Sequence, residues 1–193
     1  MKPIKNWDSV QAVEDWKKLP NGGYVCRIFG AKERTVSNGS SMLEVSVDIS
    51  EGEFKDYYAT DYRNQNNENK KWRGVLRLFV PTDDGSEKDN LTKKIFKGFT
   101  NAVEDSNPGY HWDWNENGLK GKVVGMITRN EEWEWNGKSG MSVRPFKAVS
   151  VDDIRSGNYT LPKDKYLNGS APATSAPSND GFAVIEGDDD LPF

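Results

Sequence analysis

The sequence is poor in the residues that several classes of protein require. It has one cysteine, Cys26, and one histidine, His111, so it cannot form an internal disulfide or a zinc site made of several Cys and His ligands. It has no apolar run close to the roughly 20 residues of a membrane span. Residues 1–7 lack the apolar segment of a secretion signal. We therefore expect a cytoplasmic protein with no membrane partner, no metal and no other cofactor.

Enzymatic signatures are also scarce. The glycines do not form the Gly-x4-Gly-Lys-Ser/Thr loop that binds nucleotide phosphates, which argues against a helicase or an ATPase. His111 has no Cys, Ser or second His arranged around it in the sequence, so a structural role is expected for it rather than a catalytic one. The chain is therefore expected not to be an enzyme.

Basic residues are confined to the first part of the chain. All 26 Lys and Arg lie in residues 1–165 together with 25 of the 30 acidic residues, which leaves this part with a charge of +1. Residues 166–193 hold the other five acids and no base. The net charge of −4 thus belongs to the C-terminal part, and a basic surface elsewhere must come from local clustering.

The hydrophobic pattern of residues 1–165 predicts a mainly β domain. Alternation is strict after Asn38-Gly39, where Leu43, Val45, Val47 and Ile49 share one face. Both Asn38-Gly39 and Asn136-Gly137 are typical of hairpin turns. Strands are expected at Tyr24–Val36, Leu43–Ile49, Gly74–Val80, Gly121–Trp135 and Gly140–Ser150.

Helical periodicity is clearest at Leu91–Glu104, where Ile95, Phe96, Phe99 and Val103 form one apolar stripe. Shorter helices are expected at Ser9–Leu19, at Val151–Arg155 and, beside a long loop, within residues 53–72.

The order of the long elements is strand, strand, strand, helix, strand, strand. Other small barrels and α+β sheets share it, but it is the order of the OB-fold, a five-stranded Greek-key barrel that binds oligonucleotides on the face of its second and third strands. The expected fold is this barrel with a helix between strands 3 and 4, an extra N-terminal helix and a disordered C-terminal tail. The expected divisions are residues 1–165 for the OB-fold domain, 166–185 for the linker and 186–193 for an acidic tip.

The tail has two parts with different compositions. Residues 168–181 contain no large apolar side chain, so they are expected to be disordered. The last eight residues combine acids with an apolar end, Glu186-Gly187-Asp188-Asp189-Asp190-Leu191-Pro192-Phe193. A solubility tail would be acidic too, but an apolar Leu-Pro-Phe is poorly suited to that role.

This ending resembles the acidic tip of bacterial-type single-stranded DNA-binding proteins, which end in Asp-Asp-Asp-Ile/Leu-Pro-Phe. The resemblance implies that Phe193 enters an apolar pocket on a partner protein and that its carboxylate meets a basic residue. It also implies that the acids before it face a basic rim. The residues that carry the resemblance are Asp188, Asp189, Asp190, Leu191, Pro192 and Phe193.

A second set of motifs is spread over most of residues 18–165. These motifs are Leu19-Pro20-Asn21-Gly22-Gly23-Tyr24-Val25, Phe96-Lys97-Gly98-Phe99, Ser106-Asn107-Pro108-Gly109-Tyr110, Leu119-Lys120-Gly121-Lys122 and Val149–Gly157. They make the body similar to the phage-type single-stranded DNA-binding family of Gram-positive phages and mobile elements. The similarity implies an OB-fold that binds single strands in replication or recombination within a bacterial host cell.

Aromatic residues that lie beside Lys or Arg are the candidates for DNA contact, because rings stack on bases and cations neutralise phosphates. Core packing is the alternative for Trp133, Trp135 and Phe79. For about half of the group Tyr57, Tyr58, Tyr62 and Trp72, the alternative is that the rings simply cover the barrel. Trp112 and Trp114 are expected to pack beside the helix. The candidates are Tyr57, Tyr58, Tyr62, Arg63, Lys70, Lys71, Trp72, Arg73, Arg77, Phe79, Arg129, Trp133, Trp135 and Lys138.

The favoured hypothesis is a non-enzymatic protein that coats and protects single-stranded DNA and recruits replication or recombination proteins through its C-terminal tip. Two other classes stay open. Asp48, Glu53 and Lys55 offer a loose match to a metal-dependent nuclease. A protein-interaction module without DNA affinity would share the same tail. RNA binding and a homodimer also stay open.

Overall fold

The structure is a computed structural model that describes residues 5, 17–37, 39–66 and 68–169 of the chain. Most of the expected N-terminal helix, residues 9–16, lies outside the described residues, and residues 17–19 at its expected end are not helical. The expected acidic tip, and all of the expected disordered segment after residue 169, also lie outside them.

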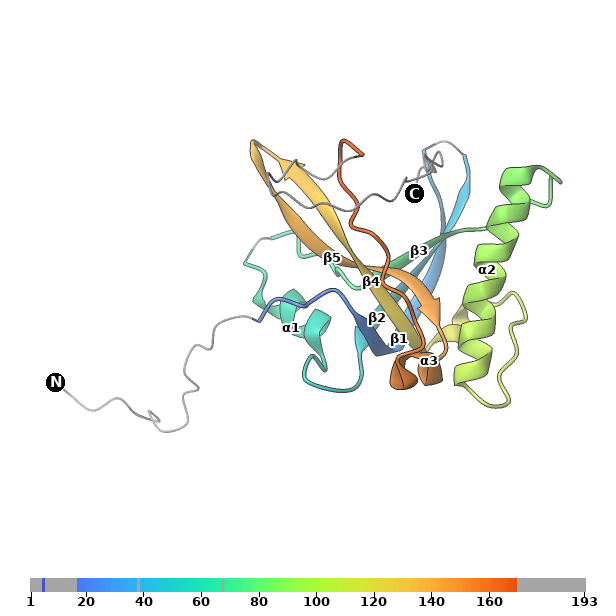
Figure 1. Cartoon of the computed structure of the whole chain (residues 1–193), viewed down its shortest axis with the longest axis horizontal. Helices are drawn as coiled ribbons and strands as arrows, with labels where there is room; N and C mark the ends of the chain where they lie inside the picture. The colour runs from blue at the N-terminus through green and yellow to red at the C-terminus, as the bar shows by residue number, and fades with distance from the viewer. Residues whose placement is uncertain (1–4, 6–16, 38, 67, 170–193) are drawn as a thin grey trace, which may run out of the picture.

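The described residues form a mainly β fold built on one five-stranded antiparallel sheet (Figure 1). The strands follow the order β3-β2-β1-β4-β5 across the sheet. Their bounds are β1 Gly23–Thr35, β2 Ser41–Ile49, β3 Val75–Phe79, β4 Val123–Trp135 and β5 Lys138–Val149. All five expected strands are therefore confirmed, with ends that shift by at most two residues.

The long hairpins form where the turn chemistry predicts them. Asn136 and Gly137 have φ values of 49° and 70°, which a type I′ turn requires and which Asn and Gly tolerate best. Trp135 and Lys138 pair directly across this turn. The tips of the β1–β2 and β4–β5 hairpins point toward the same end of the molecule (Figure 1).

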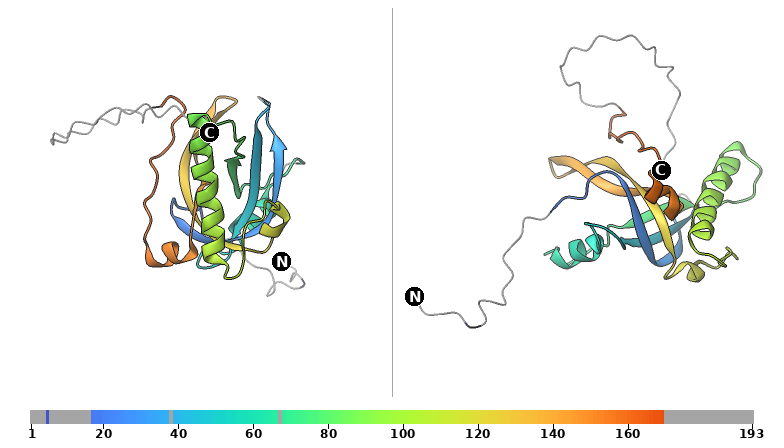
Figure 2. Two further views of the ribbon diagram at one scale, coloured as in Figure 1. Left: turned by 90° about the vertical axis from the view of Figure 1, so that its right-hand side faces the viewer. Right: turned by 60° about the horizontal axis from the view of Figure 1, so that its bottom comes forward.

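The core lies on the inner face of the sheet against helix α2, Glu87–Ser106. Leu43, Val45, Val47 and Ile49 are all buried, as the alternation predicts. Helix α2 has the β4–β5 hairpin on one side, and the β1–β2 hairpin and β3 on the other (Figure 2). Its expected stripe is buried except for Ile95, which is exposed at the edge of the helix.

The sheet is open, because the edge strands β3 and β5 are not hydrogen-bonded to each other. The closed Greek-key barrel is thus not seen in the hydrogen bonding. Both edges nevertheless line one cleft together with α2. The remaining elements are α1 Tyr57–Asn64, the 3₁₀ turn η2 Glu116–Leu119 and α3 Val151–Ser156.

After α3 the chain returns along β4 toward the hairpin tips (Figure 1). Lys165 exchanges backbone hydrogen bonds with Asn130 and Glu132 of β4, at 2.9 and 2.8 Å. Leu167 N–H donates to the Glu132 carboxylate at 3.0 Å. This segment covers the part of the β4 edge that β1 leaves unpaired, which blocks pairing with another strand there. The expected domain end at residue 165 falls within it.

None of the helices in the described part of the chain combines the length and the apolar character that crossing a membrane requires.

Candidate nucleic-acid interface

A cleft of about 540 Å³ lies between the two edge strands of the sheet. We call it the seam cleft. β3 forms one wall, β5 and the adjoining part of β4 form the other, and α2 bounds it through Ile95 and Phe99. It carries one acid, Glu131, and five cations, namely Arg77, Lys94, Arg129, Arg144 and Lys147. The lining therefore combines apolar side chains with a net positive charge.

Two of the side chains that line the seam cleft, Arg129 and Phe146, stack on each other. The register of β4 and β5 shifts between the pairs Ile127↔Lys147 and Thr128↔Pro145, so Phe146 is the extra residue of a β-bulge. Its ring lies under the Arg129 guanidinium, whose central carbon is 4.1 Å from the ring centroid. The Arg129 side chain is only 14% exposed. The bulge thus holds a ring and a cation together in the cleft.

Glu131 neutralises part of the positive charge. Its carboxylate lies 2.6 Å from the Arg129 guanidinium and 3.7 Å from that of Arg144. Lys94 and Lys147 form no ion pair with any acid among the described residues. The cleft therefore retains lysines that are available to a phosphate group.

The aromatic face of β4 continues from the cleft up the hairpin. Alternate side chains of a strand share a face, so Trp133 and Trp135 lie on the same side as the cleft residues Arg129 and Glu131. Trp133 lies against Gly140 on β5, where an added Cβ would be 3.2 Å from the indole. Trp135 is 72% exposed. The expected β-ribbon with two neighbouring indoles is present, and neither ring belongs to the core.

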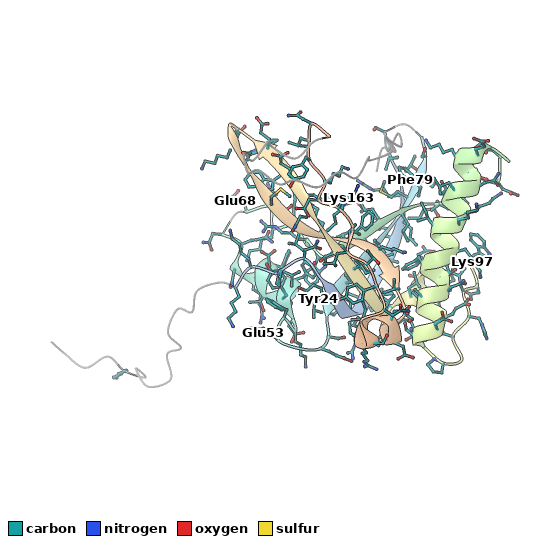
Figure 3. The ribbon with its side chains drawn as sticks, in the orientation of Figure 1. Tyr24, Glu53, Glu68, Phe79, Lys97 and Lys163 are labelled. Carbon is teal, nitrogen blue, oxygen red and sulfur yellow. The ribbon has the colours of Figure 1, made fainter. Side chains whose placement is uncertain are left out.

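β3 connects the seam cleft to the outer face of the sheet. Leu76 and Leu78 are buried, so Arg77 projects outward. Cross-strand pairing places Lys32, Glu44 and Arg77 in one row across β1, β2 and β3. The Glu44 carboxylate lies 3.0 Å from Nε of Arg77. Phe79 is half-buried on the same side as Arg77 and lines the cleft (Figure 3).

A second group of rings lies on the outer face of the sheet. We call Phe29, Tyr62 and Trp72 the outer-face cluster. The Trp72 ring meets Phe29 edge-on at 5.7 Å and Tyr62 at 6.0 Å between centroids. The Trp72 indole N–H donates to the carbonyls of Val47 and Gly74, both at 3.1 Å, which fixes the ring. Phe29 and Tyr62 are exposed and have faces available for stacking.

Four cations accompany the outer-face cluster. The ammonium of Lys70 lies 5.9 Å from the Tyr62 centroid and donates to the Arg63 carbonyl at 3.0 Å. Arg73 pairs with Asp61 at 3.1 Å. Arg63 and Lys71 are exposed. The structure thus brings Tyr62, Trp72 and these cations together, as the mixed composition of this segment predicts.

Helix α1, which carries Tyr62, is capped by a residue of β2. Its own N-cap, Asp56, forms no side-chain cap hydrogen bond. The buried carboxylate of Asp48 instead accepts hydrogen bonds from the N–H groups of Tyr58 at 2.8 Å and Ala59 at 2.9 Å. Burial raises the pKa of Asp48, and these hydrogen bonds oppose that rise. Asp48 therefore fixes α1 on the sheet.

Two of the predicted contact residues are placed differently. Tyr58 is 3% exposed and belongs to the core, so it has no ring face for a base, and we leave it out of the interface. Tyr57 is half-buried against Phe54 and Tyr58, and its hydroxyl accepts a hydrogen bond from the Leu19 N–H at 3.3 Å. Both rings are used in attaching α1 to the sheet.

The two carboxylates considered for a nuclease, Asp48 and Glu53, form other contacts. Both oxygens of Asp48 accept backbone hydrogen bonds. Glu53 pairs with Lys17 at 2.6 Å. In the part of the chain that the structure describes, no three His, Cys, Asp or Glu residues are grouped as a metal would require.

Sequence reasoning missed several residues of the interface. Phe29 directly follows the core residue Ile28, and its exposure results from the register shift between Ile28 and Gly30, which the sequence does not reveal. In β5, Arg144 and Phe146 are two residues apart, and this spacing could have indicated a cation and a ring on one face of the strand. Lys94 and Ile95 could be assigned to the cleft only once the position of α2 was known. The cleft residues missed are Lys94, Ile95, Arg144, Phe146 and Lys147.

No protein-family model matches this sequence, and no curated protein shows significant similarity to it. The fold and the site define the class as a β-sheet protein with a basic, aromatic cleft at an open edge of the sheet.

Proposed function

We propose that this protein binds single-stranded DNA without sequence preference, along the seam cleft and the outer face of β1–β3. The observation that carries the proposal is the convergence of Arg77, Arg129, Phe146 and Lys147 in one cleft, although β3 and β5 lie far apart in the sequence. Cations beside exposed rings suit a strand that offers phosphates on one side and base faces on the other.

An OB-fold is part of this proposal. The order β3-β2-β1-β4-β5 leaves β3 and β5 as edges that border the same cleft. This is the arrangement expected of a sheet that curls into a partly open five-stranded barrel, with α2 joining β3 to β4. In such a barrel the face of the second and third strands binds oligonucleotides, and here that face carries Arg77.

The binding mechanism divides between two kinds of contact. Each stacked base contributes about 1 to 3 kcal/mol, and the exposed rings available for it are Phe29, Tyr62, Trp133 and Trp135. Phosphate contacts by lysine and arginine add an electrostatic term that weakens as salt concentration rises. Because both kinds of contact ignore base identity, the protein would bind a strand of any sequence.

The C-terminal tip completes the proposed function. While the body holds DNA, residues 188–193 would recruit replication or recombination proteins, with Phe193 and its carboxylate as the group that docks. Three aspartates before an apolar end would direct the tip toward a pocket with a basic rim.

The test is a titration of the full-length protein with labelled oligo-dT at several salt concentrations, followed by tryptophan fluorescence and by anisotropy. We expect quenching of the indole emission, because Trp133 and Trp135 are exposed next to the cleft. We also expect affinity to fall as salt concentration increases.

Absence of binding at low salt, with unchanged indole emission, would refute the proposal and favour a protein-interaction module. Magnesium-dependent cleavage of the oligonucleotide would instead indicate a nuclease. A parallel titration with oligo-U separates DNA preference from a general affinity for single strands.

A further inference from the structure

Besides Trp133 and Trp135, a further exposed indole lies beside α2, outside the seam cleft. Trp114 is 70% exposed. One face of its ring lies parallel to Phe96 of α2, with 6.0 Å between centroids and 8° between planes. Trp112 contacts both rings at 6.0 and 6.2 Å. The expectation that both tryptophans pack beside the helix is confirmed, but Trp114 keeps a large part of its surface in solvent.

The backbone holds Trp114 in this position at some cost. Its φ is 64°, in the left-handed region that bulky side chains rarely adopt. The preceding loop is fixed to α2, because the Trp112 N–H donates to the Glu104 carboxylate at 2.8 Å. A strained residue that presents an aromatic ring to solvent suggests a binding role, because such conformations persist mainly at functional sites.

A run of lysines on α2 leads from the seam cleft to the helical turn that carries Phe96, the residue on which Trp114 stacks. Residues 90–103 of α2 contain Lys93, Lys94 and Lys97 and no acid. Lys94 lines the cleft, and Lys97 lies three residues further along the helix, so the two are neighbours on its surface. Figure 3 shows Lys97 at the side of α2 away from the sheet.

The lysines differ in how far they are neutralised. Lys93 pairs with the carboxylates of Asp83 and Asp89. Lys94 and Lys97 are exposed and form no ion pair with an acid among the described residues. Of the three lysines in residues 90–103, the two without an ion pair are thus Lys94, which lines the cleft, and Lys97, its neighbour on the helix surface.

We propose that single-stranded DNA leaving the seam cleft crosses α2 over Lys94 and Lys97 and stacks a base on Trp114. This inference rests on the proposed function and extends its footprint beyond the sheet. The occupant is a single strand rather than a protein, because two unpaired cations followed by a flat, exposed ring match the phosphates and a base face of such a strand. The crossing spans one helix, about 10–12 Å wide.

The experiment measures how affinity depends on strand length in Trp114→Ala. Full-length protein is titrated with labelled oligo-dT from about 6 to about 30 nucleotides, a range that brackets the roughly 4 to 16 nucleotides held by one OB-fold. We expect wild-type affinity for the shortest oligonucleotide. For the longest, we expect a loss of roughly 5- to 150-fold, equivalent to the ~1 to 3 kcal/mol of one stacked base.

Three controls separate contact from an effect on folding. Trp114→Phe should restore much of the affinity for long strands, because a ring is kept. Lys97→Gln should lower the salt dependence for long strands by about 0.7 in the slope of log K against log salt, with no change for short strands. Leu161→Ala, which removes an exposed apolar side chain elsewhere, should change neither the affinity for long strands nor its salt dependence.

Each other outcome counts against the inference in a recognisable way. An equal loss at every length would mean that Trp114 supports α2 rather than DNA, and undiminished affinity for long strands would mean that it touches no base. Failure of the wild-type protein to bind any oligonucleotide would refute the proposed function itself.

Discussion

The Arg129 guanidinium lies over the Phe146 ring, with its central carbon 4.1 Å from the ring centroid. The first residue comes from β4 and the second is the bulged residue of β5, so the irregular register of the hairpin creates the contact. The same guanidinium pairs with Glu131 at 2.6 Å. A bound phosphate would therefore compete with Glu131 for a cation that the ring already holds in place.

Phe146→Ala should weaken binding to oligo-dT. Losing the ring removes the support that it gives the Arg129 guanidinium, which should cost roughly 2- to 30-fold in affinity, from the ~0.5 to 2 kcal/mol of a cation–π contact. Anisotropy titration measures the change, and a thermal unfolding curve shows whether the variant remains folded. Phe29→Ala serves as the matched variant in the outer-face cluster. If only Phe29→Ala lost affinity for oligo-dT, the binding surface would lie at the outer-face cluster rather than in the seam cleft.

Lys147→Gln should change how the affinity for oligo-dT depends on salt concentration, and should leave the contribution from base stacking unchanged. One phosphate contact on a single strand contributes about 0.7 to the slope of log K against log salt. The slope should fall by that amount in Lys147→Gln and stay constant in Phe146→Ala. Titrations at four or more salt concentrations give both slopes, and an unchanged slope in the lysine variant would show that Lys147 contacts no phosphate.

Gly140→Val should displace the Trp133 indole. An added Cβ at Gly140 would lie 3.2 to 3.3 Å from three atoms of that ring, so the larger valine side chain forces the ring away. We expect a shifted emission spectrum and less quenching by oligo-dT. Ser139→Val is the control, because Ser139 points to the opposite face of the same hairpin. Equal effects of the two variants would indicate a general disturbance of the hairpin.

Asp89→Asn should destabilise the fold in a pH-dependent way. Burial by itself would raise the pKa of Asp89, but hydrogen bonds from Lys93 and from the N–H of Thr82 lower it to about 2. A carboxyl whose pKa is lower in the folded state stabilises the fold above its unfolded pKa of roughly 4, and this contribution disappears as the pH falls toward 2. Thermal unfolding should show a lower Tm for the variant at pH 7 and a shrinking difference below pH 4. A constant difference across that range would show that the charge of Asp89 is irrelevant.

Removal of residues 188–193 should separate the two parts of the proposed function. The shortened protein should bind oligo-dT as tightly as the full chain or more tightly, because an acidic segment that competes with phosphates is gone. It should no longer capture replication or recombination proteins from a bacterial host extract, whereas Leu161→Ala should capture them as the wild type does. A large loss of DNA affinity would contradict the assignment of the tip to protein partners.

The sequence by itself determined the local structure of the body. Alternation at Leu43–Ile49, the Asn136-Gly137 turn and the apolar stripe of α2 predict elements that the structure confirms. These signals are reliable because they depend on neighbours within a few residues: the period of a strand, the φ values of a turn and the period of a helix. The separation of charge between the body and residues 166–193 could also be read directly.

Only the tertiary structure decided which side chains share a surface. Tyr58 and Tyr62 occupy the same short helix, yet Asp48 and the core hold the first inside while the second is exposed beside Trp72. Phe146 reaches the seam cleft through a register shift, and the cleft itself exists because β3 and β5 approach without pairing. Such features depend on contacts between residues distant in the chain, which no local pattern specifies.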